Sequence, residues 1–93
     1  ELLYTGDKKE YWIDNYDTAG NLIETIYKND DYRDKDSYTY DNNNNLLSKI
    51  TYKDNKIVEK ILYTYDKYQN IIKIEKQYNG TTFIYERTFT YYE

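Results

Sequence analysis

The chain has 93 residues, a formal net charge of −4, and no cysteine, histidine, proline or methionine. This length allows one small domain with little room for a large core, and the acidic balance argues against a nucleic-acid-binding protein, which is normally basic. The missing cysteine and histidine exclude disulfides, the usual zinc sites, and thiol or imidazole catalysis. No apolar run is long enough to span a bilayer, so we expect no transmembrane segment.

Tyrosine stands out in the composition, with 15 copies. Tyrosine, isoleucine and threonine favour strands, while the many asparagines and aspartates favour turns. No segment shows a helical period with caps. The composition therefore predicts an all-β fold.

In chain order, strand-forming residues alternate with turn signals, which predicts strands over residues 10–17, 22–28, 37–41, 46–53, 57–66, 71–78 and 81–92. Residues 1–9 are expected to add an edge strand. Asp-Asn and Asn-Gly pairs predict two-residue hairpin turns within 53–56 and 78–81. The charged stretch 28–37 is predicted to be a solvated connection. Short connections between consecutive strands predict an antiparallel meander of stacked β-hairpins in a twisted or curled sheet.

A short motif recurs along the chain: Tyr-Asp, three further residues, then Asn and two aliphatic residues. Its first residues, Tyr16, Tyr40 and Tyr65, lie 24 and 25 residues apart, and Tyr91 opens a truncated further copy. A fixed motif at a fixed spacing is typical of repeats that stack on one another. We therefore predict one domain over residues 1–93, with repeats over about 10–36, 37–61 and 62–86 and a truncated fourth copy from about 87.

Each copy of the motif predicts a hairpin turn. Asp17, Asp41 and Asp66 are placed to accept hydrogen bonds from backbone amides two or three residues later. Gly20 suits a turn position at positive φ, and Asn44, the next best tolerated residue type, holds the matching place. We therefore interpret the four consecutive asparagines, residues 42–45, as part of a turn.

No metal or catalytic site is predicted. A calcium loop would want carboxylates at alternate positions, whereas the stretch 40–49 has one. An acidic cluster is interpreted as a solvated loop: Asp30, Asp31, Asp34 and Asp36. The only serines, Ser37 and Ser48, lie in no nucleophile motif, and no pair of carboxylates stands in an apolar setting suited to glycoside hydrolysis. We therefore expect no enzyme and no bound cofactor.

The motif resembles the YD repeats of the bacterial RHS-repeat family. The resemblance covers about Tyr11 to Tyr91 and rests on three stretches: Tyr16-Asp17…Gly20-Asn21-Leu22, Tyr40-Asp41…Asn44-Asn45-Leu46 and Tyr65-Asp66…Gln69-Asn70-Ile71. Two of the three lack the family's turn glycine. The resemblance implies stacked β-hairpins in a secreted or cell-surface bacterial protein, where such repeats enclose toxins, mediate surface contacts or bind carbohydrate. It implies no catalytic residue.

Alternation along the strands assigns one aromatic face. If Asp41 opposes Asn45 and Lys53 opposes Lys56, that face collects Tyr38, Tyr40, Leu46, Ile50, Tyr52, Ile57, Ile61, Tyr63 and Tyr65, with Trp12, Tyr16, Leu22 and Ile26 as counterparts in the first hairpin. The opposite face is more polar. Two interpretations follow: the sheet curls so that the rings form a tyrosine-rimmed core, or part of the face stays open as a binding platform.

The third hairpin conflicts with this assignment. A three-residue loop there would place Ile72 and Ile74 on the face opposite Tyr63 and Tyr65, and a one-residue slip inverts every side chain. We therefore expect this loop to be one residue longer or to carry a bulge, and Gln69, in the place of the turn glycine, favours a different turn.

The sequence favours a non-enzymatic β-repeat scaffold or interaction module. The alternative is a carbohydrate-binding module that uses six aromatic residues: Trp12, Tyr16, Tyr38, Tyr40, Tyr63 and Tyr65. A carboxylate-dependent hydrolase is a third hypothesis, without a motif to support it. The expected partners are another protein, or a second copy that pairs with the weakly charged last strand, residues 81–92, or a polysaccharide; nucleic acid is not expected.

Overall fold

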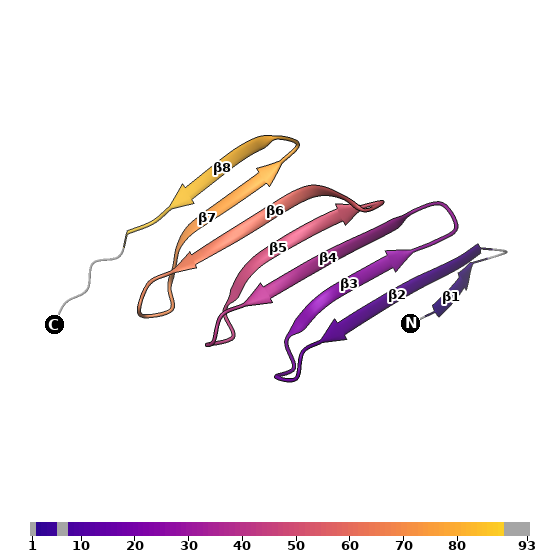
Figure 1. Ribbon diagram of the computed structural model, residues 1–93, viewed down its shortest axis with the longest axis horizontal. Coiled ribbons are helices and arrows are strands. Elements are labelled where there is room, and N and C mark those ends of the chain that lie inside the picture. Colours follow the sequence, from indigo (N-terminus) through magenta and orange to yellow (C-terminus); the bar gives the residue numbers. More distant parts are fainter. Residues whose placement is uncertain (1, 6–7, 89–93) are drawn as a thin grey trace.

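A computed structural model of the chain describes residues 2–5 and 8–88, and within them one sheet of eight antiparallel strands. The strands are β1 (Leu2–Thr5), β2 (Lys8–Tyr16), β3 (Leu22–Lys28), β4 (Arg33–Tyr40), β5 (Leu46–Lys53), β6 (Lys56–Tyr65), β7 (Ile71–Tyr78) and β8 (Thr81–Glu86). They lie in the sheet in the same order as in the chain, and β1 does not close onto β8 (Figure 1). The predicted all-β antiparallel meander is confirmed. No described segment is a helix that could cross a membrane.

The predicted turns also hold, with one correction. The stretch 28–37 is not a long connection, because the chain turns within residues 29–32 and β4 begins at Arg33. The backbone N–H of Asn29 donates to the carbonyl of Tyr32 at 3.0 Å. The side-chain oxygen of Asn29 accepts from the backbone N–H groups of Asp31 and Tyr32, at 2.8 and 2.9 Å. Asn29 thus closes the turn, and the charged residues that follow the turn form the first part of β4.

The sheet is a single layer. The molecule measures 63 × 33 × 18 Å, and among the side chains described, those of residues 9–88, no apolar one is buried. The one buried side chain is that of Ser48, which exchanges a 2.6 Å hydrogen bond with Thr39. The predicted tyrosine-rimmed core is therefore wrong for this part of the chain. Apolar side chains instead shield one another within each face.

A β-bulge recurs in all three Tyr-Asp hairpins. In the third, Thr64 pairs with Lys73 but Tyr65 pairs with Ile71, so β7 carries one extra residue, Ile72. Tyr63 pairs with Ile74 and shares its face, which confirms the bulge expected there. The same shift places Ile23 in the first hairpin and Leu47 in the second as extra residues. Alternation along the sequence predicts neither of these two bulges.

The bulges correct the predicted faces. Tyr38 pairs with Lys49 and Ser37 with Ile50, so Ile50 and Tyr52 lie on the face opposite Tyr38. We call the face of Tyr38 the aromatic face; it includes Trp12, Tyr27, Ile61, Tyr63, Ile74, Phe83 and Tyr85. The opposite, mixed face includes Tyr11, Ile13, Ile26, Lys35, Ile50, Tyr52, Leu62 and Ile84.

Charged side chains cover apolar groups on the mixed face. The ammonium group of Lys35 lies 4.6 Å from the centre of the Tyr52 ring and 3.9 Å from a carboxylate oxygen of Glu24. On the first strands, the ammonium group of Lys28 lies 5.2 Å from the centre of the Tyr11 ring. Lysine stems can shield rings in this way while their charges stay in water.

Candidate functional site: linked turns and the aromatic face

The three Tyr-Asp turns lie side by side at one end of the strands, as Figure 1 shows. In the first, the backbone N–H groups of Ala19 and Asn21 both donate to one carboxylate oxygen of Asp17, at 2.9 Å each. Asp41 and Asp66 accept the two equivalent bonds in the second and third turns. The predicted role of the aspartates as acceptors of turn amides is confirmed, although the second donor lies four residues later rather than three.

These bonds act on the charge of the aspartates. The backbone N–H of Asn21 is the largest influence holding the pKa of Asp17 below its ordinary value, and the backbone N–H of Asn45 does the same for the pKa of Asp41. A carboxylate that accepts backbone amides is stabilised in its ionised form. Each turn is therefore organised locally around one negative charge.

The fourth residue of each turn lies at positive φ. The φ angles are 89° at Gly20, 63° at Asn44 and 69° at Gln69. Gln69 therefore adopts the same conformation as its counterparts, and the expectation of a different third turn is wrong. This region costs most residues with a Cβ about 1–2 kcal/mol. Asparagine tolerates it better, so Gln69 in particular needs a compensating contact.

The compensating contacts form an amide ladder between neighbouring turns. The side-chain amide of Asn21 donates to the side-chain oxygen of Asn44 at 2.9 Å. In the next pair of turns, the side-chain oxygen of Gln69 accepts from Asn45, and from Asn43 at 3.4 Å. The residue at positive φ thus reaches back to the preceding turn, which a glycine there could not do.

The motif tyrosines make a second link between neighbouring hairpins. The hydroxyl of Tyr40 donates to the backbone carbonyl of Leu22 at 2.6 Å, and that of Tyr65 donates to the carbonyl of Leu46 at 2.6 Å. Each ring lies against the hairpin before its own, and burial is the main cause that raises the pKa of both tyrosines. We call these contacts the tyrosine links.

The first hairpin lacks both backward links in the described part of the chain. Tyr16 is 60 % exposed, and the described pairing of β1 with β2 stops at Tyr11. Trp12 is 39 % exposed and stacks on Tyr27, with ring centres 5.0 Å apart and planes tilted by 51°. The first hairpin therefore presents the most accessible rings of the six predicted site residues.

All six predicted site residues lie on the aromatic face: Trp12, Tyr16, Tyr38, Tyr40, Tyr63 and Tyr65. They do not form a uniform row, because the hydroxyls of Tyr40 and Tyr65 bind backbone carbonyls. Sequence reasoning missed Tyr27, whose hydroxyl donates to a carboxylate oxygen of Glu10 at 3.1 Å and whose ring contacts that of Tyr32. The sequence did offer a signal for it, because Tyr27-Lys28-Asn29 recurs 25 residues later as Tyr52-Lys53-Asp54, and Tyr78 follows after 26 more.

The predicted acidic loop is divided by the fold. Asp30 and Asp31 lie in the turn before β4, whereas Asp34 and Asp36 lie within β4. Asp36 accepts a 2.7 Å hydrogen bond from the hydroxyl of Thr51. Over residues 2–5 and 8–88, no three acidic side chains gather in a way that would hold a metal ion.

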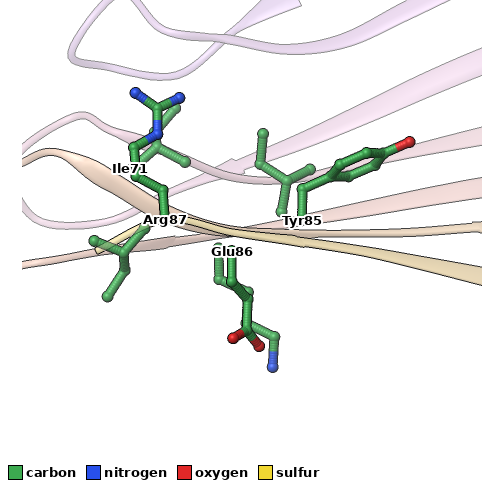
Figure 2. A pocket seen from close by; sticks show the side chains of 7 residues that line it. Ile71, Tyr85, Glu86 and Arg87 are labelled. Atoms are coloured by element: carbon green, nitrogen blue, oxygen red, sulfur yellow. The ribbon is translucent and has the colours of Figure 1, made fainter. Parts of the chain in front are cut away.

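A shallow cavity lies along β7 and β8. Ile71, Ile72, Lys73, Ile74, Tyr85, Glu86 and Arg87 line it. Figure 2 shows the Tyr85 ring and the Glu86 carboxylate on opposite sides of the sheet, as alternation along a strand requires. Ile71 is the counterpart of Leu22 and Leu46, the acceptors of the two tyrosine links. The fourth copy expected at Tyr91 lies outside the described residues.

Comparison of the chain with models of known protein families gave no match, and comparisons with curated proteins and with solved structures gave none either. The site is thus defined by its own geometry: three turns joined by an amide ladder, two tyrosine links and one aromatic face.

Proposed function

We propose that the chain is a non-enzymatic β-repeat scaffold that presents its faces and edges to partners. One observation carries the proposal: the second and third hairpins make the same two links to the hairpin before them. Such links set the spacing and orientation of successive units without a central core, as in other repeat proteins. The recurring polar groups are used to hold the units together rather than gathered around a reacting centre.

The resemblance to bacterial YD repeats supports a place for this scaffold outside the cytoplasm, in a secreted or cell-surface protein. The proposal draws on the three Tyr-Asp motifs and on the repeated hairpins, since stacked β-hairpins are what the resemblance implies. A chain without cysteine needs no disulfide in such a compartment, because its units are held by hydrogen bonds and side-chain packing.

Removal of one whole repeat tests the scaffold. Deletion of residues 41–65 joins Tyr40 to Asp66 and preserves the Tyr-Asp motif, the bulge and the links to the first hairpin. We expect a folded sheet with two strands fewer and a maximum dimension shorter by roughly 10 Å, twice the spacing between strands. Small-angle scattering and circular dichroism measure both properties.

The matched control for this experiment is deletion of residues 41–58, which puts the remaining strands out of phase with the repeat. This control should fail to fold. The scaffold proposal is contradicted if the in-phase deletion unfolds the chain as completely as the out-of-phase one.

A second candidate function is carbohydrate binding. Trp12 and Tyr16 favour it. They lie on the aromatic face of the same strand, separated there by Asp14, and are 39 % and 60 % exposed. Flat exposed rings can pack on the C–H surfaces of sugars, and neighbouring carboxylates such as Asp14 can bond their hydroxyls. Several weak contacts along a polysaccharide would add together.

The fluorescence of Trp12, the single tryptophan of the chain, reports this binding directly. Titration with a panel of polysaccharides should shift its emission, and Tyr16→Ala should weaken the response without unfolding the sheet. Tyr11→Ala is the matched control, since Tyr11 lies on the mixed face of the same strand. If no polysaccharide at millimolar sugar concentration changes the emission, this candidate fails and the scaffold proposal is unaffected.

A further inference from the structure

Strand β8 is the most exposed strand whose side chains are described. All six of its residues are exposed, including three large apolar ones: Phe83 at 45 %, Ile84 at 52 % and Tyr85 at 60 %. One side of β8 pairs with β7, while no described strand pairs with the other side. Its single charge is that of Glu86, and it contains no proline. A strand with these properties is a template for pairing with another chain.

The ladder with β7 shows which backbone groups of β8 point outward. Tyr78 and Thr81 flank the two-residue turn, where both residues have positive φ, so they form a hydrogen-bonded pair. The backbone N–H of Arg87 donates to the carbonyl of Ile72 at 2.9 Å, which confirms that odd-numbered residues of this segment face β7. The N–H and C=O groups of Thr82, Ile84 and Glu86 therefore point away from the sheet.

We propose that the partner of this edge is a second copy of the chain, paired antiparallel through β8 with Ile84 opposite Ile84. The proposal rests on the proposed scaffold function and names the partner of its C-terminal edge. In this register the outward groups of Thr82, Ile84 and Glu86 meet those of Glu86, Ile84 and Thr82 of the second copy. Both copies then contribute the same surface, as two-fold symmetry requires.

A shift of the register toward the turn loses backbone hydrogen bonds between the two copies. Moving the two-fold axis to Phe83 would pair Thr82 with Ile84 of the second copy and bring Glu86 opposite Gly80. Gly80 lies in the turn at a φ of 79° and cannot extend a strand there. The Ile84-centred register therefore satisfies all three outward residues of each copy, while this shifted register satisfies two.

The side chains of β8 complement themselves in the proposed register. On the aromatic face, Phe83 of each copy lies opposite Tyr85 of the other, which gives two cross-strand aromatic pairs. On the mixed face, Ile84 meets Ile84 and Thr82 meets Glu86. Aromatic and β-branched pairs are the ones that stabilise antiparallel strands most, and no two like charges lie opposite one another.

A charge-exchange experiment tests both the partner and the register. The wild-type chain should be a dimer by light scattering at about 100 μM, which corresponds to a dissociation constant in the micromolar range. Ile84→Lys and Ile84→Glu should each be monomeric at that concentration, with dissociation constants raised at least tenfold, because two like charges would oppose each other. An equimolar mixture should recover the dimer.

Ile57→Lys is the matched control. Ile57 is 59 % exposed and pairs with Tyr52. It lies on β6, an interior strand of the sheet, so a lysine there adds the same charge away from the edge. This variant should remain dimeric. A monomeric wild type at several hundred micromolar overturns the proposal, and so does an Ile84→Lys variant that dimerises as well as the control. A mixture that stays monomeric overturns the two-fold register.

A covalent readout keeps the test decisive if a lysine at the edge disturbs folding. The chain has no cysteine, so the only disulfide that Ile84→Cys can form joins two copies. Cα atoms of a hydrogen-bonded antiparallel pair are about 5.5 Å apart, which is within the range of disulfides. Oxidised Ile84→Cys should run as a dimer on a non-reducing gel and Ile57→Cys as a monomer; equal cross-linking overturns the proposal. The repeat-deletion experiment is independent of the dimer, so failure of the edge contact leaves the scaffold proposal standing.

Discussion

Tyr16 and Tyr65 open the same motif but lie in different surroundings. Both are followed by an aspartate that accepts the same two backbone amides. The hydroxyl of Tyr65 donates to the carbonyl of Leu46, whereas Tyr16 is 60 % exposed. The motif thus encodes two separate things: a turn that forms wherever the motif occurs, and a backward link that forms only where another hairpin precedes it.

The largest expected effect comes from removing the two rings. Tyr65→Ala should lower the free energy of unfolding by about 2–3 kcal/mol, because a packed ring and its hydrogen bond are both lost. Tyr16→Ala should lower it by less than about 0.5 kcal/mol, as is usual for an exposed site. Urea denaturation measures both. Equal losses would show that the tyrosine link contributes nothing to stability.

The aspartates should behave alike where the tyrosines differ. Asp17→Ala and Asp41→Ala should lower the urea midpoint by similar amounts at pH 7, since each removes an acceptor used only within its own turn. The pKa values of both carboxyls are lowered in the folded state, so their contribution is present above about pH 3.8 and is lost as pH falls through the folded pKa. Wild type and variants should therefore converge in acid. A clearly larger loss for Asp41→Ala would mean that the turns are not independent.

Alkaline pH tests the two tyrosine links. Burial raises the pKa of Tyr40 and Tyr65 above the ordinary value of 10.0. The folded state therefore holds their protons more tightly than the unfolded chain, and this contribution is complete below pH 10 and lost as pH rises through the folded pKa. Stability should fall above pH 10, and Tyr40→Phe with Tyr65→Phe should flatten that fall. Urea denaturation at a series of pH values measures this, and an equally steep fall in the double variant would contradict it.

The smallest expected effect concerns the residue at positive φ. Gly20→Ala should destabilise the chain by about 1 kcal/mol, because alanine tolerates this conformation poorly although no atom within 4 Å blocks its side chain. Gly20→Asn should cost less, since asparagine is tolerated there. Asn44→Gly should relieve strain but remove the bond from Asn21, leaving stability nearly unchanged. A large gain from Asn44→Gly would show that the amide ladder is not a stabilising contact.

The turns could be predicted from the sequence because their chemistry is local. An aspartate, a residue that tolerates positive φ and an asparagine suffice, and the hydrogen bonds they make span four residues at most. The faces could not be predicted in the same way. Simple alternation predicts that two adjacent aliphatic residues, such as Leu46 and Leu47, continue the strand without interruption. In the structure the second of them is the extra residue of a bulge.

The links between hairpins were beyond the reach of the sequence for a different reason. They join residues that lie 18 to 26 positions apart in the sequence, such as Tyr40 and Leu22. The residues next to either one in the sequence do not indicate which residue it will contact. Gln69 carried a usable signal all the same. A long amide side chain in a position that favours glycine indicates a contact strong enough to offset backbone strain, and here that contact is with Asn45 of the preceding turn.

The strictly sequential order of the strands has a mechanical consequence. β1 and β8 are the two edge strands of the sheet, the first and the last in the strand order (Figure 1), so tension applied between them acts across the strands rather than along them. Hydrogen bonds between two strands then open a few at a time from one end, instead of sharing the load in shear. Each hairpin that detaches would release about 25 residues, or roughly 80–90 Å of extended chain. Under tension, the molecule would therefore lengthen in repeat-sized steps at low force.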